Sequence, residues 1–217
     1  MLKLKHFVFN PFEENTYLII DNTTLDAAVV DAGMFTAKDY AEFDNFIESH
    51  GIHLNQAINT HLHLDHCFGL NHVISRYGAK LAASADDAFL GDKLAEQARQ
   101  FGIFGREGSF PAVTIDVKLK DGDIIEIGEG KLIVIASPGH TPGGIALYAP
   151  EEKFVLTGDS LFRESIGRTD LPGGNHSALV TSVKNRLLAL PPDTIVYPGH
   201  GPRTTVALEL ATNPFIR

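Results

Sequence analysis

Short runs of β-branched, aromatic and aliphatic residues open the chain, and turn residues such as Asn10-Pro11 and Asp21-Asn22 separate them. Runs of this kind, bounded by turn-forming residues, predict β-strands. The expected strands are Leu4–Phe9, Tyr17–Ile20 and Ala27–Val30.

The hydrophobic positions then take up a helical spacing. Thr36 followed by Asp39 is an N-cap signal, and Gly51 is a stop signal, so we expect a helix over Ala37–His50. After a short strand at Ala57–Asn59, strand-like hydrophobic runs and helical hydrophobic spacings recur along the chain. The pattern predicts helices at Gly69–Tyr77, from Ser84 to about Gln100, at Leu179–Leu190 and at Thr205–Ala211. The further strands are Ile124–Ile127, Lys131–Ala136, Ile145–Tyr148, Phe154–Leu156 and Thr194–Tyr197. The glycine-rich span Phe101–Pro111 is expected to be a loop.

Two groups of strands, each with helices beside it, favour a layered α/β arrangement over a barrel or a doubly wound sheet. The length of 217 residues suits one domain, and no linker-like stretch divides it, so we expect a single domain over residues 1–217. Hydrophobic residues make up 44% of the chain, enough to fill a substantial core.

The net charge, the length of the apolar stretches and the cysteine count exclude several classes of protein. The net charge of −9 argues against a nucleic-acid partner, and no apolar stretch approaches the roughly 18 residues of a membrane span. The N-terminal residues lack the apolar middle of a signal peptide, and the single cysteine, Cys67, cannot form an intrachain disulfide. We therefore expect a cytoplasmic protein; the sequence leaves its oligomeric state open.

The most informative segment is the run from His61 to His66, which reads His-Leu-His-Leu-Asp-His. Three imidazoles and one carboxylate within six residues all point inward only on a turn, and the expected strand before them and helix after them supply that setting. Imidazole and carboxylate suit a borderline divalent ion, with zinc favoured and iron or manganese as alternatives.

Three later segments repeat this pattern, each with a potential ligand a few residues past a β-rich run. His140, Asp159 and His200 each lie beside a glycine that allows a tight turn. Groups that follow strand ends converge at one edge of a sheet. The candidate ligands are His61, His63, Asp65, His66, His140, Asp159 and His200. Seven ligands exceed one tetrahedral site but suit two metal ions that share a carboxylate.

Other polar residues near these segments have simpler interpretations. Asp31 also follows a strand, and we interpret it as a turn residue or as a residue behind the ligands. Cys67 has no dedicated base, so it is interpreted as a small buried hydrophobe rather than a nucleophile. His72 is assigned a structural role.

The ordered set of motifs, from the His61–His66 run through His140 and Asp159 to His200, resembles the metallo-β-lactamase-fold superfamily. The resemblance implies an αβ/βα four-layer sandwich, with two mixed β-sheets flanked by helices and with the metals at one edge of the sheets. It also implies that His61, His63 and His140 hold one metal ion, that Asp65, His66 and His200 hold the second, and that Asp159 bridges them.

Within the superfamily, the residues after Asp159 and the stretch Ser165–Gly174 are similar to the glyoxalase II-like branch, which hydrolyses hydroxyacylglutathione thioesters. The chain resembles most its short single-domain members. Full-length glyoxalase II carries a C-terminal helical extension that helps to hold glutathione, whereas this sequence stops soon after His200. Gly201-Pro202 also replaces an aromatic that contacts the substrate in those enzymes. The resemblance places Arg168 where a basic residue contacts glutathione; a salt bridge to Asp170 is the structural alternative.

The chemistry of the ligand set favours hydrolysis. Water held between two dications loses a proton near neutral pH, and a metal-bridging hydroxide is then positioned to attack an acyl carbon. Asp65 is assigned a catalytic role, because it fixes the orientation of this hydroxide. A thioester suits such a site, because the departing thiolate needs no strong acid. The sequence predicts a binuclear hydrolase of a small-molecule thioester such as S-lactoylglutathione.

Two alternatives remain open. The run Gly167–Asp170 is also similar to persulfide dioxygenases, in which His61, His140 and Asp159 would hold a single iron ion. A binding module with a structural metal is disfavoured, because structural zinc sites are closed by four ligands. The acidic charge disfavours a nuclease of the same superfamily, and the match after Asp159 disfavours antibiotic hydrolysis.

Overall fold

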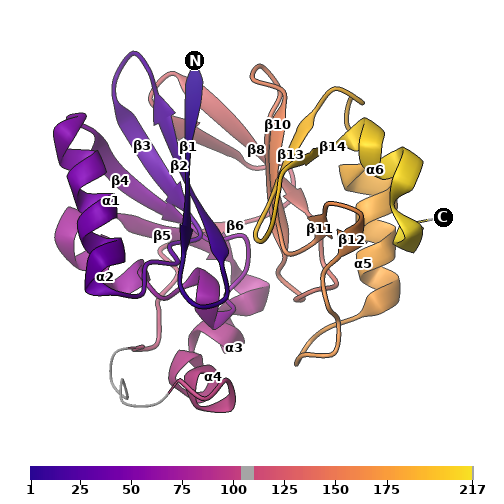
Figure 1. Ribbon diagram of the computed structural model, residues 1–217, viewed down its shortest axis with the longest axis horizontal. Coiled ribbons are helices and arrows are strands. Elements are labelled where there is room, and N and C mark those ends of the chain that lie inside the picture. The colour runs from indigo at the N-terminus through magenta and orange to yellow at the C-terminus, as the bar shows by residue number, and fades with distance from the viewer. Residues whose placement is uncertain (104–109, 217) are drawn as a thin grey trace.

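The computed structural model describes residues 1–103 and 110–216, in which the longer strands pair into two six-stranded sheets (Figure 1). The strand order of the first sheet is β1 (Leu2–Phe9), β2 (Glu14–Asp21), β3 (Asp26–Val30), β4 (His53–Ile58), β5 (Lys80–Ser84) and β6 (Val117–Leu119). The order of the second is β14 (Thr204–Thr205), β13 (Ile195–Pro198), β10 (Phe154–Gly158), β9 (Ile145–Ala149), β8 (Gly130–Ala136) and β7 (Ile124–Ile127). Both sheets are mixed: β1–β3 are antiparallel and β3–β6 parallel in the first, and β10 pairs parallel with β13 in the second.

Alternation along the strands sends neighbouring side chains to different layers. On β2, Leu18 belongs to the hydrophobic cluster that contains Phe43 of the first helix, whereas Ile19 belongs to the cluster between the sheets together with Leu147 of β9. A third cluster lies between the second sheet and the C-terminal helices. The layers are therefore helix, sheet, sheet and helix, which confirms the predicted αβ/βα sandwich.

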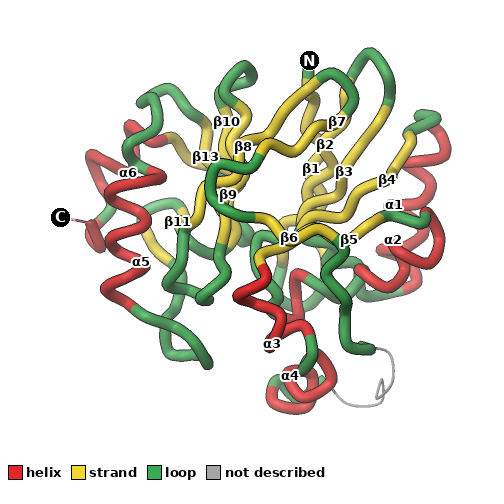
Figure 2. The backbone as a smooth tube through the Cα atoms, turned by 180° about the vertical axis from the view of Figure 1, so that it is seen from behind, coloured by secondary structure: helices red, strands yellow, loops and turns green. Residues whose placement is uncertain are grey.

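The helices cover the two outer faces of this sandwich. Figures 1 and 2 show α1 and α2 outside the first sheet, α5 and α6 outside the second, and α3 and α4 at one end. Their bounds are α1 (Ala37–Ser49), α2 (Leu70–Tyr77), α3 (Ala88–Gly91), α4 (Leu94–Gln100), α5 (His176–Ser182) and α6 (Val206–Thr212). No helix in the described part of the chain is long and apolar enough to cross a membrane.

The predicted start of α1 and the predicted end of α2 are confirmed, and the other two ends differ by one residue. Thr36 and Asp39 form a reciprocal capping box at the start of α1. Gly78 ends α2 in a left-handed conformation with φ of 68°, which a residue with a side chain rarely adopts.

The helix expected from Ser84 to Gln100 is wrong as a single element. Ser84 ends β5, and its side chain accepts a hydrogen bond from the Asp86 amide, so it caps a short 3-10 turn rather than a long helix. The chain then forms α3 and α4, with a break at Asp92-Lys93. The strands β5 and β6 and the small hairpin of β11 (Leu161–Phe162) and β12 (Ser165–Ile166) were not predicted.

Smaller differences concern the C-terminal half. The helix expected at Leu179–Leu190 begins earlier, because α5 starts at His176 with Asn175 as its N-cap. It continues as a π-helical turn over Val183–Leu187. In the loop expected at Phe101–Pro111, residues 101–103 and 110–111 are neither helix nor strand, and 104–109 lie outside the described residues.

Candidate metal centre

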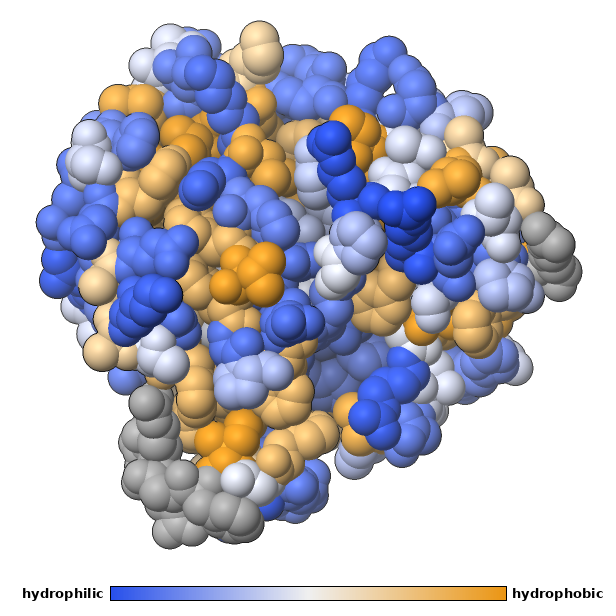
Figure 3. Space-filling model, in the orientation of Figure 1, coloured by the Kyte–Doolittle hydropathy of each residue, from blue (hydrophilic) through white to orange (hydrophobic). Residues whose placement is uncertain are grey.

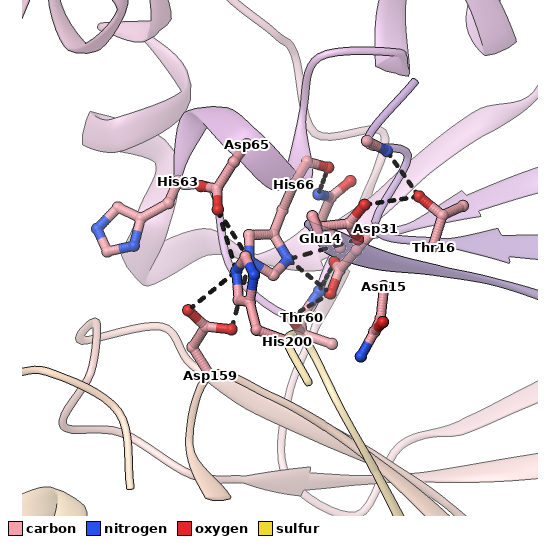
Figure 4. A network of polar contacts seen from close by, with 12 residues as sticks. Glu14, Asn15, Thr16, Asp31, Thr60, His63, Asp65, His66, Asp159 and His200 are labelled. Carbon is pink, nitrogen blue, oxygen red and sulfur yellow. Dashed lines mark hydrogen bonds and ion pairs between the residues drawn. The ribbon is translucent and has the colours of Figure 1, made fainter. Parts of the chain in front are cut away.

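The candidate ligands lie on loops that leave the strands at one edge of the sandwich. The loop after β4 carries the first four, with Leu64–His66 forming a 3-10 turn before α2. His140 follows β8, Asp159 follows β10 and His200 follows β13. All seven side chains predicted from the sequence are therefore brought to one place, and Figure 4 shows Asp65, His66, Asp159 and His200 pointing toward one another.

The seven residues form two groups of three and one carboxylate between them. One ligand atom each from His61, His63 and His140 lie within 4.8 Å of one another, and the same holds for Asp65, His66 and His200. We call these the first and the second triad. Oδ1 of Asp159 lies 3.4 Å from Nε2 of His66, and Oδ2 lies 3.6 Å from Nε2 of His140. Asp159 thus reaches both triads.

In three of the histidines, the contact made by one ring nitrogen shows that the other nitrogen faces the centre of the ligand cluster. Nδ1 of His140 donates to the Arg168 carbonyl at 2.7 Å, and Nδ1 of His200 donates to the Phe12 carbonyl at 3.0 Å. Nδ1 of His61 lies 3.1 Å from the Thr60 hydroxyl. A hydrogen bond from the second ring nitrogen to an oxygen atom fixes the tautomer and orientation of a metal-binding histidine. In these three rings Nε2 is therefore the atom presented to the centre.

Buried polar atoms without partners support a cation at this place. Among the described residues, Nε2 of His61, Nε2 of His66 and Oδ1 of Asp159 are buried and lack a hydrogen-bond partner. Buried groups of this kind are rarely left unsatisfied. A set of imidazole nitrogens and carboxylate oxygens is also the donor set that zinc, iron and manganese accept, so the site fits metal ions.

The electrostatics of the site leave His61, His63 and the two aspartates in metal-binding form. Burial of His66 opposes its protonation, but the surrounding carboxylates outweigh burial and raise the pKa of that ring. Burial lowers the pKa of His61, and it lowers that of His63 to about 3, so both rings are neutral near pH 7. Burial opposes ionisation of Asp65 and Asp159, but the charge of His66 outweighs it and holds their pKa values below the ordinary range. Neutral imidazole and ionised carboxylate are the ligand forms.

Two carboxylates lie behind the ligands. Asp31 accepts hydrogen bonds from the amide and the hydroxyl of Thr60 at 2.8 and 2.7 Å, and its Oδ2 lies 3.0 Å from Nδ1 of His66. This agrees with its interpretation as a residue behind the ligands, although one of its oxygens also lies within 4.8 Å of ligand atoms of His61 and His66. Glu14, which the sequence did not single out, is fully buried 4.0 Å from Nδ1 of His66, and burial raises its pKa.

A further buried carboxylate, Asp87, joins two ligand loops and was also missed. It accepts hydrogen bonds from the Leu62 amide at 3.3 Å, the Thr141 hydroxyl at 2.8 Å and the Gly143 amide at 2.6 Å. Leu62 lies between the first two histidines of the motif, and Thr141 follows His140. Asp87 therefore holds together the backbone that carries the first triad.

Gln97 of α4 performs a similar task on the other side of His63. Its side-chain oxygen accepts from the Leu64 amide at 3.0 Å, and its nitrogen donates to the carbonyls of Leu62 at 3.3 Å and Leu90 at 2.9 Å. The peptide units on both sides of His63 are thereby fixed. No sequence pattern marks this residue, because its partners are backbone groups.

The remaining residues of interest have ordinary surroundings or a salt bridge. His72 bonds the Asp44 carboxylate at 2.9 Å, as its assigned structural role requires. Nε and Nη2 of Arg168 each donate to Asp170 at 2.7 Å, so the structural alternative is formed. Arg168 still lines the cavity in front of the ligands, and contact with substrate stays a prediction.

Cys67 is buried, and burial raises the pKa of its thiol, which agrees with its interpretation as a hydrophobe. We expect Cys67→Ala to retain metal content and turnover and to lower the free energy of unfolding by only about 1 kcal/mol, because it removes one small buried atom. Metal analysis, steady-state kinetics and urea unfolding check this. Loss of turnover in a folded, metal-loaded variant would indicate that Cys67 takes part in catalysis.

Comparison with known proteins now identifies the class. The family model described as the metallo-beta-lactamase superfamily matches residues 9–200, and the chain belongs to this superfamily. Among curated relatives, the hydroxyacylglutathione hydrolase GloC of Haemophilus influenzae is 34% identical over 206 residues, which cover 94% of this chain and 93% of the relative.

Solved structures agree on the fold and differ in their described roles. The chain matches the BLEG-1 B3 metallo-beta-lactamase with a TM-score of 0.87 and 29% identity, covering 99% of each chain. It matches TTHA1623 in a di-iron-bound form with a TM-score of 0.84 and 34% identity, covering 97% of this chain and 99% of that one. It matches ETHE1 from Myxococcus xanthus with a TM-score of 0.79 and 26% identity, covering 98% of this chain and 83% of that one.

Proposed function

We propose that this protein is a metal-dependent hydrolase that cleaves thioesters such as S-lactoylglutathione, with two divalent metal ions and with zinc favoured. The observation that carries the proposal is the pair of triads with Asp159 between them, which suits two ions rather than one. The named activity of the 34%-identical relative supports the thioester as substrate. The di-iron-bound relative keeps iron as the alternative metal.

The residues for the two ions follow from the grouping of the side chains. His61, His63 and His140 would hold the first ion, Asp65, His66 and His200 the second, and Asp159 both. When bound, the two ions supply acidification of water and stabilisation of the negative charge that develops on the acyl oxygen.

The chain itself supplies a shaped cavity and proton acceptors. A cavity of about 220 Å³ in front of the triads is lined by Asp65, Asp159 and Arg168, among others. Asp65 lines this cavity, and its carboxylate would accept a hydrogen bond from the attacking water and so set the direction of approach. A thiolate leaves without a proton from the protein, so the lack of a dedicated acid suits a thioester.

Two other reactions are kept as outcomes of the same test. The likeness to ETHE1 and the run Gly167–Asp170 favour the mononuclear iron persulfide dioxygenase as the second candidate. The likeness to a B3 metallo-beta-lactamase brings in β-lactam hydrolysis.

We expect the purified, metal-loaded protein to release thiol from S-lactoylglutathione, to stop when a chelator removes the metal and to recover when metal is restored. Metal analysis is expected to give two ions per chain. One iron per chain with oxygen uptake on glutathione persulfide would replace the hydrolase by the dioxygenase. Turnover of nitrocefin without thioester cleavage would replace it by a β-lactamase.

A further inference from the structure

A second, smaller cavity adjoins the cavity of the metal centre, and we call it the apolar cavity. Its volume is about 80 Å³, and α3 and α4 form one wall and the loop before α5 the other. Its apolar lining is provided by Phe89, Leu90, Phe101, Leu171 and Pro172. His63, Phe101 and Leu171 line both cavities, so the two lie next to each other beside the first triad. A group that enters the apolar cavity therefore remains next to the metal centre.

Exposed aromatic side chains mark the apolar cavity as a place for a ligand. Phe89 is 37% exposed and Phe101 41%, although most large hydrophobic side chains of the described chain are buried. Figure 3 shows hydrophobic side chains gathered in the lower part of the molecule, where Figure 1 places α4. Exposed apolar surface inside a concavity, next to a few polar groups, is typical of small-molecule sites.

The wall of the apolar cavity is built by tight packing, and Lys93 and Gln100 in its lining both contact Glu96. A Cβ on Gly173 would lie 2.7 Å from Pro142 and 3.3 Å from Phe89, so the loop after Leu171 packs closely on the aromatic ring. Gln97 also lines the cavity, but its amide bonds the backbone of the ligand loop and of α3. The surface left for a ligand is therefore mainly hydrocarbon.

The charges around the two cavities do not suit a large anionic arm. Among the described lining residues, imidazoles aside, the cations are Lys93 and Arg168. Asp170 holds the fork of Arg168 with two hydrogen bonds, and Lys93 lies at the cavity rim 3.9 Å from Glu96. A tripeptide with two carboxylates finds few free cations here, whereas a short hydrocarbon finds a complementary surface.

We propose that the apolar cavity is a substrate subsite that receives a short apolar group of the thioester. The inference rests on the proposed hydrolase function and specifies its substrate class. A volume of about 80 Å³ equals roughly two to three water molecules, which suits a chain of about three carbon atoms and excludes a peptide. The group belongs either to the acyl or to the thiol side of the thioester, and the experiment separates the two.

The test compares kcat/KM for matched thioesters. The acyl arm compares S-butanoylglutathione with S-lactoylglutathione, and the thiol arm compares the lactoyl thioester of butanethiol with that of glutathione. We expect the wild type to favour the apolar member about tenfold in one arm, because each methylene buried in an apolar pocket is worth about tenfold or more in kcat/KM. The arm that shows the preference identifies the side of the thioester.

Variants connect the preference to the apolar cavity. Phe89→Ser and Leu171→Asn are expected to bring the ratio of kcat/KM values to within about threefold of one, because each makes the wall polar. Phe215→Ser is the matched control, since this ring is 48% exposed and does not line the cavity, and it is expected to keep the full ratio.

The outcomes separate this inference from the proposed function. Cleavage of all three thioesters with wild-type ratios within twofold, or a full preference that survives Phe89→Ser and Leu171→Asn, overturns the subsite and leaves the hydrolase. No cleavage of any of the three thioesters by metal-loaded protein overturns the hydrolase, and the subsite with it.

Discussion

Asp159→Asn is expected to lower kcat on the thioester by about 10³-fold and to leave fewer than two metal ions per chain. Asp159 is the carboxylate that reaches His140 of the first triad at 3.6 Å and His66 of the second at 3.4 Å. The amide keeps the shape but removes the negative charge and turns donor hydrogens toward the cations. Steady-state kinetics and metal analysis of the purified variant measure both effects.

The same substitution at an exposed aspartate shows whether the loss of turnover and of metal is specific to Asp159. Asp193→Asn makes the same chemical change at an exposed carboxylate that pairs with Lys153, and it is expected to keep two metal ions and full turnover. If Asp159→Asn retained two ions and turned over within threefold of the wild type, Asp159 would not bridge the metals. The two triads would then act as separate sites.

The elements that a local pattern defines were predicted well. The helix α1 has a capping box, an apolar stripe and a glycine stop within sixteen residues, so its sequence alone specifies its ends. The hairpin-like strands β7 to β10 pair with neighbours in sequence, and their hydrophobic runs are bounded by turn residues.

The missed elements depend on distant partners. β5 and β6 are short strands that pair in parallel with each other, and β5 also pairs in parallel with β4, so the sheet rather than the local sequence defines them. Ser84, with two aspartates shortly after it, has the pattern of a helix N-terminus. In the structure it caps only a short 3-10 turn that follows β5. Without the sheet, nothing in the local sequence separates these outcomes.

The candidate site divides in the same way. Its seven ligand candidates could be found because histidine and aspartate recur after strand ends, and strand ends meet at one edge. Glu14, Asp87 and Gln97 could not, because the groups that they contact on the ligand loops lie far away in sequence. A carboxylate or amide that holds loops in place has no spacing of its own.

The support that Asp87 gives to the ligand loops leads to the second large effect. Asp87→Ala removes the acceptor of three buried donors, on Leu62, Thr141 and Gly143. Because buried donors without partners are costly, the free energy of unfolding of the metal-free protein is expected to fall by about 3–5 kcal/mol. Urea unfolding, with Asp193→Ala as a surface control, measures the loss.

Metal affinity shows whether Asp87 does more than stabilise the fold. The loops that it joins carry the first triad, whereas His66 of the second triad rests against Asp31. Asp87→Asn, which keeps the shape and one acceptor oxygen, is expected to fold and to bind one of its two metal ions about 10–100-fold more weakly, in a competition titration with a chelator. Equal weakening of both ions, or no weakening at all in the folded variant, would show that Asp87 serves the fold alone. A loss confined to one ion would show that a residue outside the ligand motif sets the geometry of the first triad.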